Sequence, residues 1–196
     1  DRTGMYRLTF TQDSDADILV NLGGYIASTT MRNADVKKVS NNEIEGSFDT
    51  YGRHWGGPEN VKVHFVIRFD KDFERLDGWR DKERYSDIDT LQGSSIITRR
   101  HPKEELSYLD SPTSGVSAHY RVKTGDKICV RTAISYVSVD NARENLENDA
   151  VTWDFDLVKK TSQDEWNKWL GRIEVKGGSQ KQRTKFYTDL WHVLLG

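Results

Sequence analysis

The stretch that decides the fold covers residues 134–196 and reads ISYVSVDNARENLENDAVTWDFDLVKKTSQDEWNKWLGRIEVKGGSQKQRTKFYTDLWHVLLG. It opens as a strand and then changes to three segments that have the period of a helix. These segments run from about Val139 to Asn148, from about Asp154 to Leu170, and over 180–195. We therefore expect a β-rich region before residue 138 and helices after it.

Start and stop signals support the second and third helices. Thr152 or Asp154 can cap the second helix, and Gly171 can end it. Ser179 and Gln182 fit a capping box at the start of the third helix. The second helix should bury a stripe made of Val158, Ser162, Trp166, Trp169 and Leu170.

The third helix is expected to need a partner. Its large apolar side chains recur at helical spacing: Phe186, Tyr187, Leu190, Trp191 and Leu194. Such a face is too apolar to stay exposed alone. The chain therefore looks cut at the start of a second, helical domain, and residues 180–195 should fold back on the sandwich, self-associate with another copy, or fray.

Ahead of the helices, apolar residues alternate with polar ones, which is the period of a half-buried strand. The pattern is clearest in Val61, Val63, Phe65, Ile67 and Phe69. Further strands are expected at 6–10, 18–22, 36–39, 43–51, 73–79, 116–122 and 127–137. Many short strands at this spacing predict a mainly β fold, an antiparallel β-sandwich followed by C-terminal α-helices.

Two connections are predicted between these strands. Asn41-Asn42 should form a tight hairpin turn, for which two Asn can supply positive φ. Arg80–Gly115 has few periodic apolar positions and should be a long insertion, either a surface loop or the lining of a binding surface.

Composition excludes several classes of function. The 29 Lys and Arg nearly balance the 31 Asp and Glu, so no basic field exists to attract nucleic acid. No apolar run is long enough for a membrane span. Cys129 is the only cysteine, which excludes an intrachain disulfide, and its strand context predicts a buried, inert thiol.

Local motifs for catalysis or metal binding are absent. The five histidines form no HExxH pattern, and no GxSxG motif occurs. The acidic pairs Asp154/Asp156 and Asp164/Glu165 are explained by a helix N-terminus and a solvated helix face. Glu83, Asp87 and Asp89 lack the spacing of a calcium loop. We therefore assign no catalytic residue and no metal ligand within this chain.

The segment RHWGGPEN at 53–60 is the best candidate for ligand contact. His54 and Trp55 stand in a Gly/Pro-rich turn between two good strands. A sugar face can stack on Trp, and His can hydrogen-bond hydroxyl groups, although Trp55 could instead fold back on the sandwich edge. Loops at strand ends often carry binding, so His54 and Trp55 are the candidate carbohydrate contacts.

Several stretches together carry a family resemblance. ISYVSVDNARENLEND (134–149), WDFDLVKKTSQDEWNKWLGRIEVKGG (153–178) and QRTKFYTDLWHVLL (182–195) resemble the end of the N-terminal domain of glycoside hydrolase family 92. RTGMYRLTF (2–10), ADILVNLG (16–23) and NNEIEGSF (41–48) are similar to the same domain. The C-terminal block is long and specific, whereas the N-terminal matches are short. The segment 80–115 resembles nothing that we can place from the sequence and is expected to be peculiar to this protein.

The resemblance implies an exo-acting, calcium-dependent α-mannosidase that inverts configuration and removes terminal mannose from glycans, with an α-1,2 linkage preferred. In that family an N-terminal β-sandwich packs on an (α/α)6 barrel, and the substrate cleft lies between them. The catalytic acid, the catalytic base and the calcium ligands belong to the barrel, and the family's opening segment should precede Asp1. None of these residues can be transferred to this chain, which alone should be inactive.

The expected division is a sandwich over 1–137, a helical linker over 138–178 and the first barrel helix over 179–196. The expected partners are a mannose-containing glycan and the protein's own barrel domain. The resemblance also implies an extracytoplasmic bacterial protein, whether periplasmic, secreted or attached to the surface. The alternatives are a carbohydrate-binding sandwich module without catalysis and a structural interaction domain.

Overall fold

A computed structural model describes residues 2–26, 29–54, 57–93, 114–149 and 151–195. The chain divides into two compact units, Asp1–Trp153 and Asp154–Gly196. The first contains all the strands of the described residues and one helix, and the second contains two helices.

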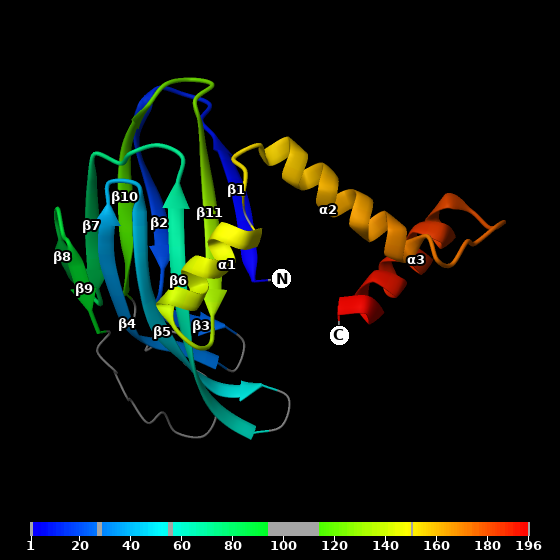
Figure 1. The fold of residues 1–196 in the computed structure, drawn as a ribbon, viewed down its shortest axis with the longest axis horizontal. Helices are drawn as coiled ribbons and strands as arrows, with labels where there is room; N and C mark the ends of the chain where they lie inside the picture. The colour runs from blue at the N-terminus through cyan, green and yellow to red at the C-terminus, as the bar shows by residue number, and fades with distance from the viewer. Residues whose placement is uncertain (1, 27–28, 55–56, 94–113, 150, 196) are drawn as a thin grey trace. The chain divides into compact units, whose positions relative to one another are not determined.

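The described strands of the first unit form two antiparallel sheets (Figure 1). In strand order, the larger sheet contains β1 (Thr3–Thr9), β11 (Lys127–Ser135), β6 (Gly57–Phe69), β5 (Glu43–His54), β4 (Thr29–Ser40) and β3 (Gly24–Ile26), with β9 (Thr90–Gln92) also paired to β4. The smaller sheet contains β2 (Ser14–Asn21), β10 (Ser114–Val122), β7 (Arg75–Arg80) and β8 (Glu83–Tyr85). The predicted antiparallel sandwich followed by helices is confirmed.

The main core lies between the two sheets. β6 contributes Phe65, Ile67 and Phe69 to it, so the alternation predicted for this strand is correct. β10 contributes Val116 and Tyr120 from the smaller sheet. Burial of large side chains such as these stabilises the fold by about 1.5–3 kcal/mol each.

A second, smaller core lies on the opposite face of the larger sheet. Helix α1 (Val139–Asp149) covers β11 and β6 there (Figure 1). Val66 and Ala133 of the sheet pack against Ala142 and Leu146 of the helix, and all four are buried. The first predicted helix is therefore an integral layer of the sandwich unit.

The predicted hairpin across Asn41-Asn42 forms, with Ser40 paired to Glu43. The expected positive φ at these asparagines is wrong, because the non-glycine residues with positive φ in the described ranges are Asn33, Asp81 and Asp87. The register of β4 against β5 shifts between Lys38 and Ser40 instead. Such irregularities locally increase the twist of paired strands.

The segment 80–115 is more regular than expected. It includes the short strands β8 and β9, which belong to different sheets. Leu91 of β9 is buried in the main core, and Ile88 packs against that core. The part at 94–113 lies outside the described residues, so its predicted surface role remains untested.

In the second unit, α2 (Phe155–Leu170) and α3 (Gln180–Leu195) have the predicted ends. The Asp154 carboxylate accepts a hydrogen bond from the Leu157 amide at 3.0 Å, and Gly171 follows the last turn. The Ser179 amide donates to Gln182 Oε1 at 2.7 Å and the Gln182 amide to Ser179 Oγ at 3.3 Å, which is the predicted capping box.

The predicted buried stripe of α2 is not buried. Val158, Trp166 and Leu170 are half-buried, whereas Ser162 and Trp169 are exposed. Trp166 packs edge-on against Trp191 of α3, with ring centroids 6.1 Å apart. Two helices alone do not enclose a core, which explains the difference. The predicted division at 137/138 and 178/179 remains a prediction.

Candidate functional site

The predicted carbohydrate contacts lie at the end of the β5–β6 hairpin. The ladder between these strands continues to the pair His54 and Gly57, well past the pair His64 and Ser135 that ends β11 (Figure 1). Trp55 lies outside the described residues, and the side chain of His54 is not described. The assignment of His54 and Trp55 therefore stays a prediction, on a hairpin that reaches beyond its neighbour β11.

Closer to the sandwich, the same hairpin carries a set of charged residues that pair with each other. Asp49 Oδ1 lies 3.3 Å from Lys62 Nζ, and Asn33 Nδ2 donates to Asp49 Oδ2 at 2.8 Å. The guanidinium carbon of Arg32 lies 4.0 Å from the centre of the Tyr51 ring. One face of Tyr51 is thus already covered, so these contacts support the hairpin more readily than they bind a sugar.

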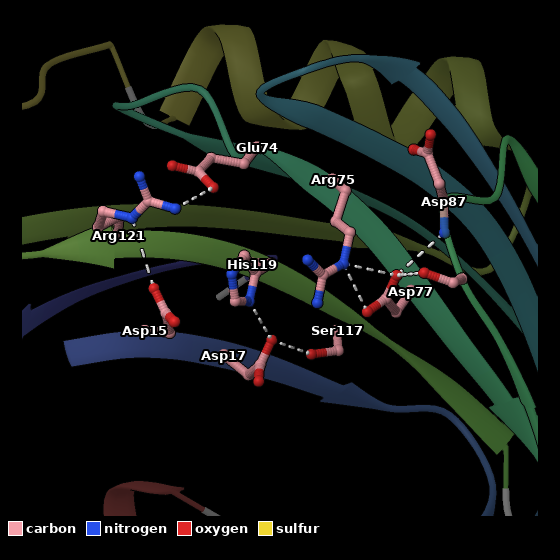
Figure 2. A network of polar contacts seen from close by, with 10 residues as sticks. Asp15, Asp17, Glu74, Arg75, Asp77, Asp87, Ser117, His119 and Arg121 are labelled. Atoms are coloured by element: carbon pink, nitrogen blue, oxygen red, sulfur yellow. Dashed lines mark hydrogen bonds and ion pairs between the residues drawn. The ribbon is translucent and has the colours of Figure 1, made fainter.

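A larger polar network covers the outer face of the smaller sheet (Figure 2). His119 on β10 and Asp17 on β2 are direct neighbours across the ladder, and His119 Nδ1 lies 3.2 Å from Asp17 Oδ1. Ser117 Oγ donates to the same carboxylate oxygen at 3.0 Å. The strand alternation explains the grouping, because outward residues two apart on adjacent strands share one face.

On β7, Arg75 and Asp77 extend this network. Arg75 Nε donates to Asp77 Oδ2 at 2.9 Å, and Ser86 Oγ and the Asp87 amide both donate to Asp77 Oδ1 at 3.0 Å (Figure 2). Partial burial opposes ionisation of Asp77, but the hydrogen bonds from the Asp87 amide and from Arg75 outweigh it and lower the pKa of this carboxyl group. Asp77 is therefore a fixed anion beside a fixed guanidinium.

Ser117, His119 and Asp17 have the residue types of a hydrolase triad but not its geometry. In a triad, the imidazole takes the proton of the serine hydroxyl while its other nitrogen donates to the carboxylate. Here the serine donates to Asp17, so no base is placed to activate it. The network can bind a ligand or stabilise the sheet, but its geometry does not support nucleophilic catalysis.

A second ionic cluster joins α1 to the larger sheet. Glu43 is 6% exposed and accepts hydrogen bonds from Arg68 Nε at 2.5 Å and from Arg143 Nη1. Arg143 Nη2 also donates to Glu45 at 2.5 Å. Burial opposes ionisation of Glu43, but Arg143 and Arg68 outweigh this effect and lower its pKa. This cluster is enclosed and serves stability.

The remaining candidates from the sequence have structural roles. Asp154 caps α2, and Asp164 pairs with Lys160 along the helix at 2.6 Å. Cys129 is buried, and burial together with the nearby Asp70 raises the pKa of its thiol, as expected for an inert cysteine. Within the described ranges, no group of three or more His, Cys, Asp or Glu side chains could hold a metal ion.

The second unit has an open hollow of about 640 Å³. Leu170 of α2 and one face of α3, including Arg183 and Trp191, line it. Arg183 donates to the carbonyl oxygens of Gly177 and Gly178 at 3.1 and 2.9 Å, so its charge holds the preceding turn. The lining contains no carboxylate, which leaves no acid or base for glycoside cleavage there. None of the described helices has the length and apolar character needed to span a membrane.

The groupings that sequence reasoning missed join distant segments. His119 and Asp17 are 102 residues apart, and Arg143 and Glu43 are 100 residues apart. No local spacing could show either pair. The available signal was the alternation of β10 and β5, which predicts that His119 and Glu43 face away from the main core.

Comparison with known structures places this fold among mannosidases. The family GH92 α-mannosidase BT3965 from Bacteroides thetaiotaomicron is 23% identical, with a TM-score of 0.72, over 97% of this chain and 23% of that one. A structure of the same enzyme in complex with mannoimidazole gives the same values. The family GH92 inverting mannosidase BT2199 from Bacteroides thetaiotaomicron VPI-5482 is 18% identical, with a TM-score of 0.72, over 97% of this chain and 22% of that one. The chain thus spans about a quarter of the length of these structures.

Two family models match successive parts of the chain, while no curated protein sequence matches it. Residues 1–135 match the glycosyl hydrolase family 92 N-terminal domain, and residues 141–196 match the glycosyl hydrolase family 92 catalytic domain. The first match alone covers more than half of the chain and ends where the sandwich strands end. The chain therefore belongs to glycosyl hydrolase family 92.

Proposed function

We propose that this chain is the N-terminal part of an α-mannosidase that removes terminal mannose from glycans with inversion of configuration. One observation carries the proposal: the N-terminal and catalytic models of family 92 match the chain in that order, over a sandwich followed by helices. The sandwich would support an (α/α)6 barrel and form part of the substrate cleft. The resemblance to α-mannosidases, one of them solved with mannoimidazole, supports this substrate class.

The same proposal places the reacting groups in the catalytic domain. They would lie outside residues 141–196, the part of this chain that matches the catalytic-domain family model. An inverting glycosidase needs an acid and a base roughly 6.5–9.5 Å apart, with room for water between them. The acidic groups of the polar networks are instead held by arginines or by hydrogen bonds. Calcium would be bound by the catalytic domain, as the resemblance to family 92 implies.

The finer expectations are also part of the proposal. The preferred linkage is α-1,2, and the protein acts outside the bacterial cytoplasm, in the periplasm, at the surface or after secretion. The partners are a mannose-containing glycan and the protein's own barrel domain. A carbohydrate-binding module without catalysis is the alternative, and the polar sheet face of Figure 2 is the observation that favours it.

Mannose release from α-1,2-mannobiose and from an aryl α-mannoside tests the proposal. The parent polypeptide with its complete catalytic domain is compared with the 196-residue chain, each in calcium and in a chelator. We expect the parent to release mannose initially as the β-anomer and to lose this activity in the chelator. We expect the 196-residue chain to show no turnover. Turnover by this chain that disappears when one of its own carboxylates is replaced would overturn the assignment of roles. A parent that is inert on all α-mannosides would overturn the proposed activity.

A further inference from the structure

The outer face of the smaller sheet holds an aromatic platform beside its polar network. Trp79 on β7 pairs with Gly115 on β10. A Cβ atom placed on Gly115 would lie only 2.5 Å from both Cζ2 and Cη2 of Trp79. The benzene side of the indole therefore lies over the glycine backbone, in space that any other side chain would fill. A glycine inside a strand often marks such a close approach.

The platform and the polar network lie on one line along β7. Arg75, Asp77 and Trp79 alternate outward, because Leu76 between them points into the main core. With a rise of about 3.3 Å per residue, Arg75 and Trp79 stand roughly 13 Å apart. This distance is long enough for two adjoining sugar rings, one on the indole and one beside the guanidinium.

Hydrogen-bonding groups remain available on the same sheet face, four residues along the strands from the platform. Arg75 uses Nε for Asp77, and its two terminal nitrogens make no hydrogen bond among the described residues. Asp17 accepts its two bonds at Oδ1, and its side chain is 51% exposed. Leu19, on the same face of β2, is 67% exposed and offers an apolar contact.

The charge of the face selects among ligands. The five carboxylates labelled in Figure 2 outnumber the two labelled arginines, Arg75 and Arg121, and they remain in excess when Arg84, the cross-strand neighbour of Trp79, is added. A sulfated or phosphorylated chain would therefore be repelled. An aromatic ring next to a few oriented donors and acceptors instead suits a neutral ligand with apolar C–H faces and many hydroxyl groups.

We propose that the outer face of the smaller sheet binds a neutral oligosaccharide. One sugar ring stacks on Trp79, and hydroxyl groups of an adjoining ring bind the Arg75 guanidinium and the Asp17 carboxylate. The binding surface is inferred from the geometry of these residues alone. The choice of a mannose polymer as the first probe rests on the proposed function.

Calorimetric titration of the 196-residue chain with soluble α-mannan and with a panel of neutral gluco- and xylo-oligosaccharides tests this site. Trp79→Ala should weaken binding about tenfold or more, because a lost aromatic contact also loses its buried area. Trp79→Phe should retain part of the affinity. Asp17→Asn, on a different strand, should weaken binding independently of the platform. Tyr136→Ala is the control, since Tyr136 is an exposed aromatic, 68% accessible, on the connection between β11 and α1.

Thermal unfolding of each variant shows that it is folded. The proposal is overturned if no neutral glycan binds, if Trp79→Ala and Asp17→Asn bind like the original chain, or if heparin binds more tightly than the neutral panel. Binding of a neutral glycan other than mannan, lost in Trp79→Ala, supports the surface while counting against a mannose-specific role. Failure of the surface leaves the mannose-release assay as a separate test.

Discussion

Glu43 is the residue on which the attachment of α1 depends most. Its carboxylate is enclosed between Arg68 of β6 and Arg143 of α1. The side chains of both arginines are partly buried, 25% and 27% exposed, so removal of Glu43 would leave two partly desolvated guanidinium groups without this anionic partner. The loss of folding stability caused by such a change exceeds the small contribution that an exposed ion pair makes to stability.

We predict that Glu43→Gln lowers the free energy of unfolding of the sandwich unit by about 3 kcal/mol, because it breaks an enclosed ion pair. Urea unfolding followed by circular dichroism measures the change. The control is Glu147→Gln: Glu147 also approaches Arg68, at 3.9 Å, but its side chain is 59% exposed, and its loss should cost under about 1 kcal/mol. Equal effects of the two changes would contradict the role given to Glu43.

The same pair has a pH dependence with a defined sign. The pKa of Glu43 is lower in the folded chain than its ordinary value of 4.5, so its stabilising effect is present above that value. The effect is lost as the pH falls below 4.5 and through the folded pKa. The difference between the original chain and Glu43→Gln should therefore be constant near pH 7 and shrink in acid.

At the scale of single residues, the sequence predicted which face of a strand a side chain lies on, but not which distant residue it contacts. The alternation of residues 43–51 puts Ile44 and Glu43 on opposite faces of the strand, and the structure does the same: Ile44 lies in the main core and Glu43 pairs with Arg143. The partner Arg143 was out of reach, because only the return of α1 over the sheet brings it near. Positive φ at Asn41 or Asn42 was wrong, and the register of β4 against β5 shifts beside this turn.

At the scale of elements, β4 and β5 depend on a bulge in β4 and on a nearby glycine of β5, Gly46, which pairs with Val36. The register shifts between Arg32 and Asp35, and Asn33 has a φ of 55°. The bulge brings the Asp35 carbonyl oxygen to 1.9 Å from the position a Cβ of residue 46 would take. Only glycine fits there without moving the backbone.

We predict that Gly46→Ala destabilises the sandwich unit by about 3 kcal/mol, because a methyl group in that position must displace the backbone of β4. Chemical denaturation measures it. Gly4→Ala is the matched control in the same sheet, where the nearest atom to the new Cβ would be the Thr132 hydroxyl at 3.1 Å, on a side chain that can move. A loss as large for Gly4→Ala would refute the explanation by the bulge.

The elements that the sequence predicted well are long, and those it missed are short. β6 and α2 repeat their period several times, and α2 also has cap residues at both ends. β8 and β9 have three residues each, too few for alternation to be visible. Their place in the sheets is decided by tertiary contacts such as the burial of Leu91 in the main core.

For the whole molecule, the apolar face of α3 decides behaviour in solution. Trp191 and Leu194 are exposed, and no residue of α3 is buried. We predict that the 196-residue chain forms a dimer whose population rises with concentration, since burial of each large side chain yields about 1.5–3 kcal/mol.

Sedimentation velocity of this chain beside one that ends at Gly178 measures the effect. The shorter chain should remain a monomer, and Leu194→Glu in the longer chain should weaken the dimer. Monomers at every concentration for both lengths would contradict a docking role for this face.

At this scale the fold class and the family followed from the sequence, but the polar sheet face did not. The residues labelled in Figure 2 come from β2, β7 and β10, from the residue before β7 and, for Asp87, from the connection between β8 and β9, and only the tertiary fold brings them together. Trp79 was included in a strand, yet its position over Gly115 depends on the register of β7 against β10.

The position of α1 constrains how genes of this family can be recombined. The two family models meet between residues 135 and 141, across the start of this helix at Val139. A crossover there would join Glu43, Val66 and Ala133 of one parent to the α1 of another, and both the ion cluster and the smaller core would have to match by chance. A crossover after Trp153 keeps α1 with the sheet that it covers. Functional chimaeras, whether engineered or inherited, should therefore have their junctions after residue 153.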